Sequence, residues 1–181
     1  RAAAGVTYTA ATMLGPGNVR HVAGNATFLG LEPYVAGRVL ALADLLNGAG
    51  LETHAVDGIE GRLWGKAVVN AAINPLTALG RVTNGALPDS PDRRALLMML
   101  AREAAAVAHA AGVTLPFDDP VGYVESVCRA TAANRSSMLQ DVEAGRRTEI
   151  DSINGIIVAE GKANGVDVCA NEIVWRLVRA L

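Results

Sequence analysis

The chain has 181 residues, of which 51% are hydrophobic, 19% charged and 4% aromatic, and its formal net charge is −2. This composition supplies enough apolar surface for a buried core and argues against a disordered chain. Because the sequence has no basic run and few aromatic residues, a nucleic-acid partner is not expected.

The first segment is rich in residues that favour strands and turns. Val6–Leu14 carries Val, Thr and Tyr, which suit strands, and the sequence Gly15-Pro16-Gly17-Asn18 that follows is a strong turn signal. Two more short strands are predicted over Val19–Ala23 and Ala26–Leu29, separated by Gly24-Asn25. The three strands together predict a small antiparallel meander.

A helix and one more strand complete this segment. Pro33 suits a first helical turn, the apolar residues that follow it have helical spacing, and Gly48 ends the pattern. A short strand is then predicted over Glu52–Val56. A few strands and one helix cannot form a closed sandwich or a doubly wound sheet. We therefore interpret residues 1–57 as the end of an α/β domain.

From Gly58 onward the pattern is helical throughout, so residues 58–181 predict an all-α domain and the whole chain an α+β fold. Helices are predicted over Ile59–Asn74, from Ser90 to Ala111, from Asp119 to Ala133, from Ser137 to Gly145, from Thr148 to Asn164 and over Glu172–Leu181.

Local capping signals predict where these helices begin. Ser90 and Asp119 each precede a proline, the arrangement of a capping residue followed by the first helical turn. Ser137 stands three residues before a glutamine, which is a capping box, and Thr148 stands three residues before an aspartate. Asn171 is the predicted cap of the last helix.

The cysteines and histidines give no sign of a metal site. Cys128 and Cys169 are far apart in sequence, so we interpret them as free thiols of a protein in a reducing, cytoplasmic compartment. The three histidines stand alone, and we expect no bound metal. No apolar stretch reaches the roughly 18 residues that a bilayer span requires, so no membrane partner is expected.

A polar stripe on the first long helix is the first candidate for chemistry. Lys66, Asn70 and Asn74 stand at i, i+4 and i+8, so they share one helix face, and small or apolar residues separate them. Buried polar groups need partners, which a ligand could supply; the alternative is a solvent-facing stripe. Pro75 is expected to break or kink the helix after Asn74.

Two further polar stretches have a functional and a structural interpretation. Ser137 at a helix start, next to free backbone N–H groups, suits an anion, but a serine there is more often a plain cap. Glu149 in a first helical turn is stabilised in its charged form, which by itself requires no active site. The sequence contains neither a G-x-G-x-x-G nor a P-loop pattern.

Taken together, these stretches resemble the ketopantoate reductase family, along nearly all of the chain. One departure is that Val168–Ala170 precede Asn171, where the family often has a proline. The stretch Gly5–Gly30 resembles the last strands of the family's nucleotide-binding domain. The other matching stretches are Lys66–Thr77 (KAVVNAAINPLT), Asn84-Gly85, Ser136–Val142 (SSMLQDV) and Thr148–Gly155 (TEIDSING).

The resemblance implies a fold, a reaction and a cofactor. Residues 1–57 would be the C-terminal part of a Rossmann-like NADP-binding domain, residues 58–181 a helical substrate and catalytic domain, and the active site would lie between them. The family reaction is the NADPH-dependent reduction of 2-dehydropantoate to pantoate, a step toward pantothenate. Because the family's glycine-rich loop would precede Arg1, we expect a fragment that is inactive without it and a sheet with an unpaired edge.

The resemblance also implies residue roles. Lys66 would be the general acid, since an ammonium aimed at the keto oxygen supplies the proton and stabilises the developing alkoxide. Ala11 and Glu149 would contact the cofactor. We expect Lys66, Asn70, Ser137 and Glu149 to line one cleft. The substrate-binding positions would be Asn70, Asn74, Asn84, Asn134 and Ser137.

Two other functions stay open. One is a related reductase of another branched 2-keto acid, because the motifs define the chemistry better than they define the substrate pocket. The other is a non-catalytic helical module that serves in dimerisation. A scaffold has no need of the polar set Lys66, Asn70, Ser137 and Glu149, so the enzyme is preferred. The expected partner is a small 2-keto acid, and a homodimer is left open.

Overall fold

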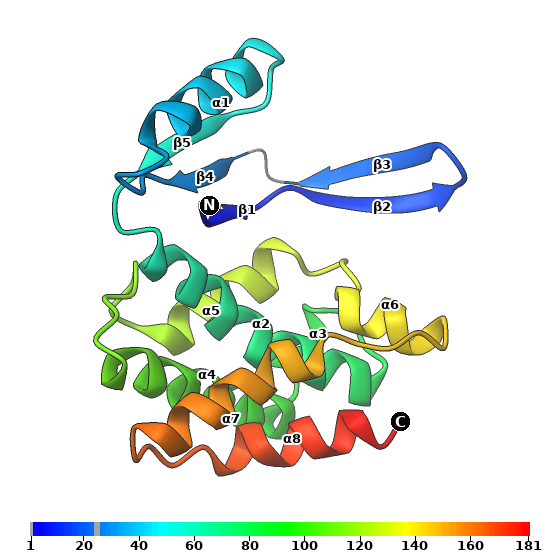
Figure 1. Cartoon of the computed structure of the whole chain (residues 1–181). Helices are drawn as coiled ribbons and strands as arrows, with labels where there is room; N and C mark the ends of the chain where they lie inside the picture. Colours follow the sequence, from blue (N-terminus) through cyan, green and yellow to red (C-terminus); the bar gives the residue numbers. More distant parts are fainter. Residues whose placement is uncertain (1, 24–25) are drawn as a thin grey trace. The chain divides into compact units, whose positions relative to one another are not determined.

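The computed structural model of the chain describes residues 2–23 and 26–181, and it divides into two compact units, Arg1–Leu63 and Trp64–Leu181. Among the described residues, the strands and one complete helix lie in the first unit, and the regular structure of the second unit is helical (Figure 1). The predicted α+β class, with an all-α C-terminal part, is confirmed.

The first unit is built on a three-stranded sheet with the order β1-β4-β5. β1 (Gly5–Thr7) pairs antiparallel with β4 (Thr27–Gly30), and β4 pairs parallel with β5 (Thr53–Val56). Parallel neighbours need a crossover, which helix α1 (Ala36–Gly48) supplies. Within the described residues, β1 and β5 are the edge strands of this sheet.

The predicted meander is wrong. β2 (Ala10–Gly15) and β3 (Asn18–Ala23) form a separate hairpin, while β4 pairs back with β1 instead of with β3. The predicted turn is confirmed: Pro16 and Gly17 connect the two strands, and Gly17 has the positive φ of 72° that such turns require. The strand predicted over Val6–Leu14 is two strands, because the chain pairs with β4 up to Thr7 and with β3 from Ala10 onward. A register shift follows between Ala10 and Ala11. Gly24-Asn25 lies outside the described residues.

The second unit packs its helices around the middle of α2, where residues 71–78 are all buried. Helix α4 contacts α3, α5, α7 and α8. All the helices predicted for this part of the chain are present, together with a short one, α3, that was not predicted. The helices are α2 (Glu60–Gly80), α3 (Ala86–Asp89), α4 (Pro91–Ala110), α5 (Pro120–Ala130), α6 (Ser137–Glu143), the 3-10 helix η1 (Ile150–Ser152), α7 (Asn154–Ala163) and α8 (Cys169–Arg179). No helix among the described residues is long and apolar enough to cross a bilayer.

Of the caps predicted for α4 and α5, only the one on α5 is present. Asp119 caps α5 as predicted, because its Oδ1 accepts the N–H groups of Val121 and Gly122, each at 3.0 Å. Ser90 occupies the position before α4, but its side chain makes no capping hydrogen bond, so that part of the prediction is wrong. Pro91 at the first position has no N–H to satisfy, which leaves α4 less dependent on a cap.

Three other predicted helix starts are wrong. α6 is capped by Ser136 and not by Ser137. The segment after Thr148 begins as the 3-10 helix η1, and α7 follows only at Asn154. α8 begins at Cys169, which places Asn171 inside its first turn. At the start of α8, N–H groups without an acceptor inside the helix are satisfied by a distant helix: the Glu103 carboxylate of α4 accepts the N–H groups of residues 170 and 171, each at 2.9 Å.

Pro75 was predicted to break or kink the helix, and a break is wrong, since α2 continues to Gly80. A proline lacks the N–H that would bond the carbonyl oxygen four residues earlier, which here is that of Ala71. That oxygen instead accepts a hydrogen bond from Asn154 Nδ2 at 3.0 Å. A side chain from α7 therefore replaces the missing helical hydrogen bond.

Candidate active site

The polar stripe of α2 runs from half-buried to buried positions. Lys66 and Asn70 are half-buried, and Asn74, one helical turn further on, is only 6% exposed. The stripe therefore does not simply face solvent. It leads into the helical core, where each polar group requires a hydrogen-bonding partner.

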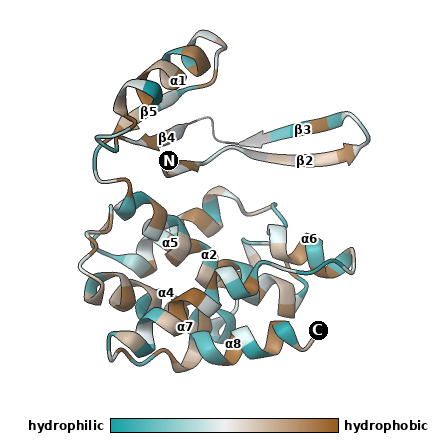
Figure 2. Ribbon diagram, viewed as in Figure 1, coloured by the Kyte–Doolittle hydropathy of each residue, from teal (hydrophilic) through white to brown (hydrophobic). Residues whose placement is uncertain are grey.

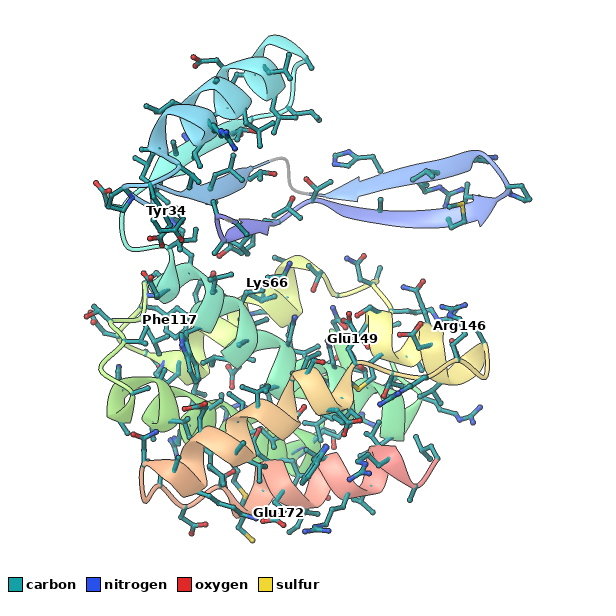
Figure 3. All side chains as sticks on the ribbon, viewed as in Figure 1. Tyr34, Lys66, Phe117, Arg146, Glu149 and Glu172 are labelled. Carbon is teal, nitrogen blue, oxygen red and sulfur yellow. The ribbon has the colours of Figure 1, made fainter. Side chains whose placement is uncertain are left out.

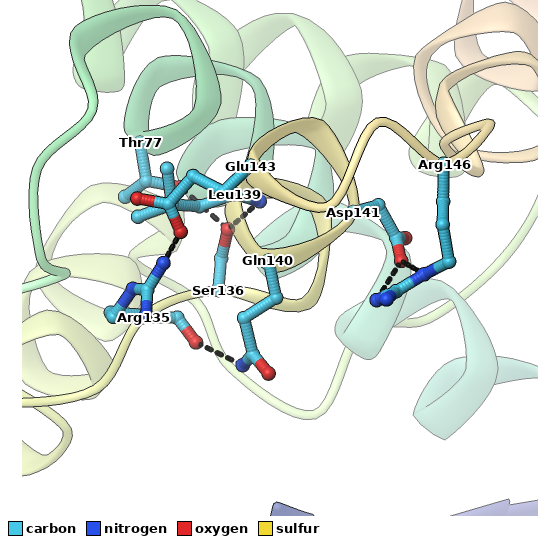
Figure 4. A network of polar contacts seen from close by, with 8 residues as sticks. All are labelled: Thr77, Arg135, Ser136, Leu139, Gln140, Asp141, Glu143 and Arg146. Atoms are coloured by element: carbon cyan, nitrogen blue, oxygen red, sulfur yellow. Dashed lines mark hydrogen bonds and ion pairs between the residues drawn. The ribbon is translucent and has the colours of Figure 1, made fainter. Parts of the chain in front are cut away.

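The C-terminal part of α2 is joined to the start of α6 by two buried hydroxyls. Thr77 Oγ1 lies 2.7 Å from Ser136 Oγ, which also accepts the N–H of Leu139 at 3.0 Å (Figure 4). Thr77 Oγ1 is also 2.9 Å from the carbonyl oxygen of Asn74. The capping serine of α6 is thereby held one turn beyond the end of the stripe. Ser137, the next residue, is exposed.

The ends of α6 are held by polar contacts that Figure 4 also shows. Arg135 forms an ion pair with Glu143, and its carbonyl oxygen accepts a hydrogen bond from Gln140 Nε2 at 2.9 Å. Arg146 donates to Asp141 Oδ1 through Nε and Nη2, at 3.0 and 2.8 Å. These contacts fasten the chain before and after α6, so Ser137 is presented from a fixed turn.

Asn84 and Asn134 are brought together by the backbone. The N–H of Asn84 donates to the carbonyl oxygen of Asn134 at 3.0 Å, and Asn84 Nδ2 donates to Thr131 Oγ1 at 2.9 Å. A side chain on Gly85 would place its Cβ only 2.6 Å from the Cβ of Ala132, so the close approach depends on glycine. Asn84 Oδ1 is buried and has no hydrogen-bond partner among the described residues. An orphaned buried acceptor of this kind suits a ligand that donates a hydrogen bond.

The stretch Thr148–Gly155 lies against α2 and α6. Glu149 is exposed, and the next residue, Ile150, is buried in a cluster with Ala78 of α2, Met138 of α6 and Val178 of α8. Lys66 and Glu149 both lie along the upper side of the helical unit as drawn in Figure 3, whereas Glu172 lies on the lower side. The three sequence stretches thus meet through side chains that neighbour the candidate residues.

The remaining candidate, Ala11, belongs to the first unit. It is an exposed residue near the start of β2, opposite His21. Its side chain offers no chemistry, so only its backbone could contact a ligand.

Three residues that hold the candidate site together were not singled out from the sequence: Thr77, Ser136 and Asn154. The capping-box rule selected Ser137 because Gln140 stands three residues later. Gln140 bonds Arg135 instead. The apolar neighbours of Thr77 gave a signal, since a lone hydroxyl in such a run needs a partner.

Two titratable groups near these elements are perturbed. The hydrogen bond from Trp175 Nε1, at 2.8 Å, holds the pKa of Asp151 below its ordinary value, and Arg147 and Arg179 act in the same direction. Burial, assisted by Glu125, raises the pKa of Cys128 to about 11. The Cys128 thiol therefore stays protonated near neutral pH, which argues against thiolate chemistry. Over residues 2–23 and 26–181, no group of three or more His, Cys, Asp or Glu side chains could hold a metal ion.

Comparison with known proteins agrees with the resemblance read from the sequence. The family described as ketopantoate reductase PanE/ApbA, C terminal, matches residues 58–181. A 2-dehydropantoate 2-reductase of Archaeoglobus fulgidus is 40% identical over 178 residues, which cover 98% of this chain and 60% of that protein. The chain thus spans about three fifths of the length of this relative.

Solved structures share the same fold over the same length. A PanE/ApbA family ketopantoate reductase from Ralstonia eutropha JMP134 superposes with a TM-score of 0.88 and 35% identity, covering 98% of this chain and 58% of that one. D-mandelate dehydrogenase, solved with NADH and anilino(oxo)acetate, superposes with a TM-score of 0.87 and 29% identity, covering 96% of this chain and 58% of that one.

Proposed function

The chain belongs to the ketopantoate reductase family, and we propose that the protein carrying it reduces 2-dehydropantoate to pantoate with NADPH, a step toward pantothenate. The observation that carries the proposal is the meeting of three polar stretches far apart in sequence. Thr77 contacts Ser136, Asn154 bonds Ala71, and Met138 shares a buried cluster with Ile150. A pure scaffold needs no such arrangement of amides, hydroxyls and a lysine.

Lys66 is the proposed general acid. Hydride arrival at the keto carbon turns the carbonyl oxygen into an alkoxide, so an ammonium beside that oxygen gains interaction mainly in the transition state and delivers the proton. Asn70, Asn74 and Asn84 would hold the substrate's polar groups, and the orphaned Oδ1 of Asn84 suits a hydroxyl donor. Ser137 and Asn134 would bind the substrate from the turn before α6.

The cofactor would supply the hydride. In this chain its proposed contacts are the Glu149 carboxylate and the Ala11 backbone, and both residues are exposed and thus accessible to a ligand. We further propose that residues 1–57 are the C-terminal part of the NADP-binding domain and that residues 58–181 form the substrate and catalytic domain. The family match that begins at residue 58 and the division of the chain at Leu63 support this assignment.

The test is steady-state kinetics of Lys66→Ala in the full-length protein that carries this chain. Turnover should fall roughly 10²–10⁴-fold because both the proton donor and the transition-state charge are lost. NADPH affinity, measured separately by fluorescence titration, should change little. The matched control is Lys162→Ala, since Lys162 on α7 pairs with Glu172 on α8, away from the three stretches. Near-normal turnover of Lys66→Ala would remove Lys66 as the acid.

Ser137→Ala should change the steady-state kinetics in a different way from Lys66→Ala. Ser137 would contact the substrate in the ground state as well as in the transition state, so its loss should mainly raise KM. A large fall in kcat at unchanged KM would contradict the proposed substrate-binding role.

A second candidate function is the reduction of another 2-keto acid. The structural similarity to D-mandelate dehydrogenase favours it, because that protein acts on an aromatic 2-hydroxy acid. Comparing kcat/KM for 2-dehydropantoate and for the keto acid of mandelate, each with NADPH and NADH, distinguishes the two functions. A higher kcat/KM for the aromatic keto acid would replace the first proposal with the second.

A further inference from the structure

Helix α2 has a gap in its hydrogen bonding in the middle of the polar stripe. In an α-helix the N–H of each residue bonds the carbonyl oxygen four residues earlier, and Pro75 has no N–H to offer Ala71. Ala71 is 0% exposed, so water cannot satisfy this oxygen. A buried backbone carbonyl without a partner is costly, and an interrupted turn bends readily.

Asn154 fills this gap. Its Nδ2 lies 3.0 Å from the Ala71 oxygen and 2.9 Å from Asn171 Oδ1, and the Asn154 side chain is itself 0% exposed. A carbonyl oxygen can only accept, so the group that faces Ala71 is the amide NH₂, and its two protons serve these two acceptors.

The position of Asn154 is set by a chain of hydrogen bonds across the core. Asn171 Nδ2 donates to Glu103 Oε2 at 2.8 Å and to the carbonyl oxygen of Leu100 at 3.3 Å. The Glu103 carboxylate also accepts the backbone N–H groups of Ala170 and Asn171 in the first turn of α8. The chain of bonds therefore runs from α4, through the start of α8 and Asn154 of α7, to the middle of α2.

The gap lies between members of the stripe. Ala71 follows Asn70 directly, and Pro75 follows Asn74 directly. A bend in this turn would swing Lys66 and Asn70 relative to Asn74. We propose that Asn154 is a positioning residue, which bonds Ala71 to keep α2 continuous across Pro75 and so holds the lysine at a fixed orientation to Asn74. This inference rests on the proposed function, in which these residues act on one substrate.

A double-mutant cycle between Asn154→Ala and Pro75→Ala in the full-length protein tests the proposal. Pro75→Ala restores the backbone N–H, so the Ala71 oxygen regains a partner without Asn154. Asn154→Ala should lower kcat about 10²-fold when residue 75 is proline, the size expected from a misplacement of about 1 Å, and much less when it is alanine. Cofactor affinity should be the same in all four proteins. An equal loss of kcat in both backgrounds would overturn the proposal.

Val124→Ala is the control. Val124 of α5 is buried in the same core, and its apolar side chain takes no part in the hydrogen bonds that reach Ala71. It should lower Tm equally in both backgrounds and show no coupling to residue 75. If Asn154→Ala behaves like this control, with a lower Tm and an unchanged kcat, Asn154 has only a structural role and the inference fails.

A second readout does not depend on activity. Amide hydrogen exchange of α2 peptides should accelerate in Asn154→Ala and return toward wild type in the double variant. If the wild-type protein does not reduce 2-dehydropantoate, the proposed function fails, and this exchange cycle still decides whether Asn154 spans the gap. Should Asn154→Ala aggregate, recovery of soluble protein by Pro75→Ala is the expected result, and continued aggregation counts against the proposal.

Discussion

The two units of the chain bury their apolar side chains to different extents. The helical unit has a large core drawn from α2, α3, α4, α5, α7 and α8, and a smaller cluster that includes Met138 and Ile150. The described part of the first unit buries only a few apolar side chains, among them Val39 and Ala43 of α1. Several of its large apolar residues are exposed, including Leu42 and Leu45, and α1 is apolar in colour over much of its length (Figure 2).

This difference in burial predicts a difference in local stability between the two units. A unit with its own dense core resists local opening, whereas a unit with few buried apolar contacts opens at a lower free energy. The candidate residues on α2 and α6, and Glu149 just before η1, belong to the unit with the dense core. We expect them to keep their mutual geometry even when the first unit fluctuates. Only Ala11 depends on the less buried unit.

The largest expected effect comes from removing core volume in the helical unit. Leu100 of α4 is fully buried, so Leu100→Ala should lower the free energy of unfolding by about 2–5 kcal/mol. Val39→Ala in α1 removes less apolar surface and should cost about 1–2 kcal/mol. Hydrogen exchange measured by mass spectrometry should show faster exchange across residues 64–181 for Leu100→Ala and only within the first unit for Val39→Ala. Equal acceleration of both units by Val39→Ala would show that the two open together.

Glycine substitutions should have opposite signs in the two units. A Cβ on Gly85 would lie 2.9 Å from the backbone Cα of Ala132, so Gly85→Ala forces the chain apart and should cost about 1–3 kcal/mol. Gly48, the last residue of α1, has open space around it, and Gly48→Ala should stabilise the first unit by about 0.4–1 kcal/mol. Urea unfolding of both variants measures these changes. A stabilising Gly85→Ala would mean that the contact between Asn84 and Asn134 tolerates a wider spacing.

The same contrast explains how far the sequence predicts the structure. A local signal predicted the cap of α5 correctly, since Asp119 accepts from neighbours two and three residues away, whereas the local signals at Ser90 and Thr148 did not. Two other predictions failed because a partner is distant in sequence. The start of α8 depends on Glu103, 67 positions before Ala170, and the continuity of α2 on Asn154, 83 positions after Ala71.

The candidate site follows the same rule. The stripe on α2 was predictable from helical spacing alone, and its residues do follow one another at successive turns. The use of Ser136 instead of Ser137 as the cap of α6 was not predictable, because Ser136 is bonded to the hydroxyl of Thr77, 59 positions away. Strand pairing failed for a related reason: the alternation of β3 and β4 does not specify which neighbour each strand takes.

The smallest expected effect concerns the acid end of the pH range. Trp175 Nε1 donates to Asp151 Oδ1 beside the candidate Glu149, and this bond is the largest cause of the lowered pKa of Asp151. A carboxyl whose pKa is lower in the folded state stabilises the fold above the unfolded-state pKa, near pH 4, and loses this contribution as the pH falls through the folded-state value. Trp175→Phe keeps an aromatic ring but removes the N–H donor to Asp151.

This variant should therefore be slightly less stable than wild type at pH 7, and the difference in stability should shrink below about pH 4. Carboxyl chemical shifts of Asp151, followed by NMR, should show its pKa rising toward the ordinary value. The matched control is His54→Asn, which removes the exposed pair with Glu52 in the first unit and should leave this titration unchanged. A stability difference for Trp175→Phe that is as large at pH 3 as at pH 7 would assign the effect to lost ring packing instead of to the hydrogen bond.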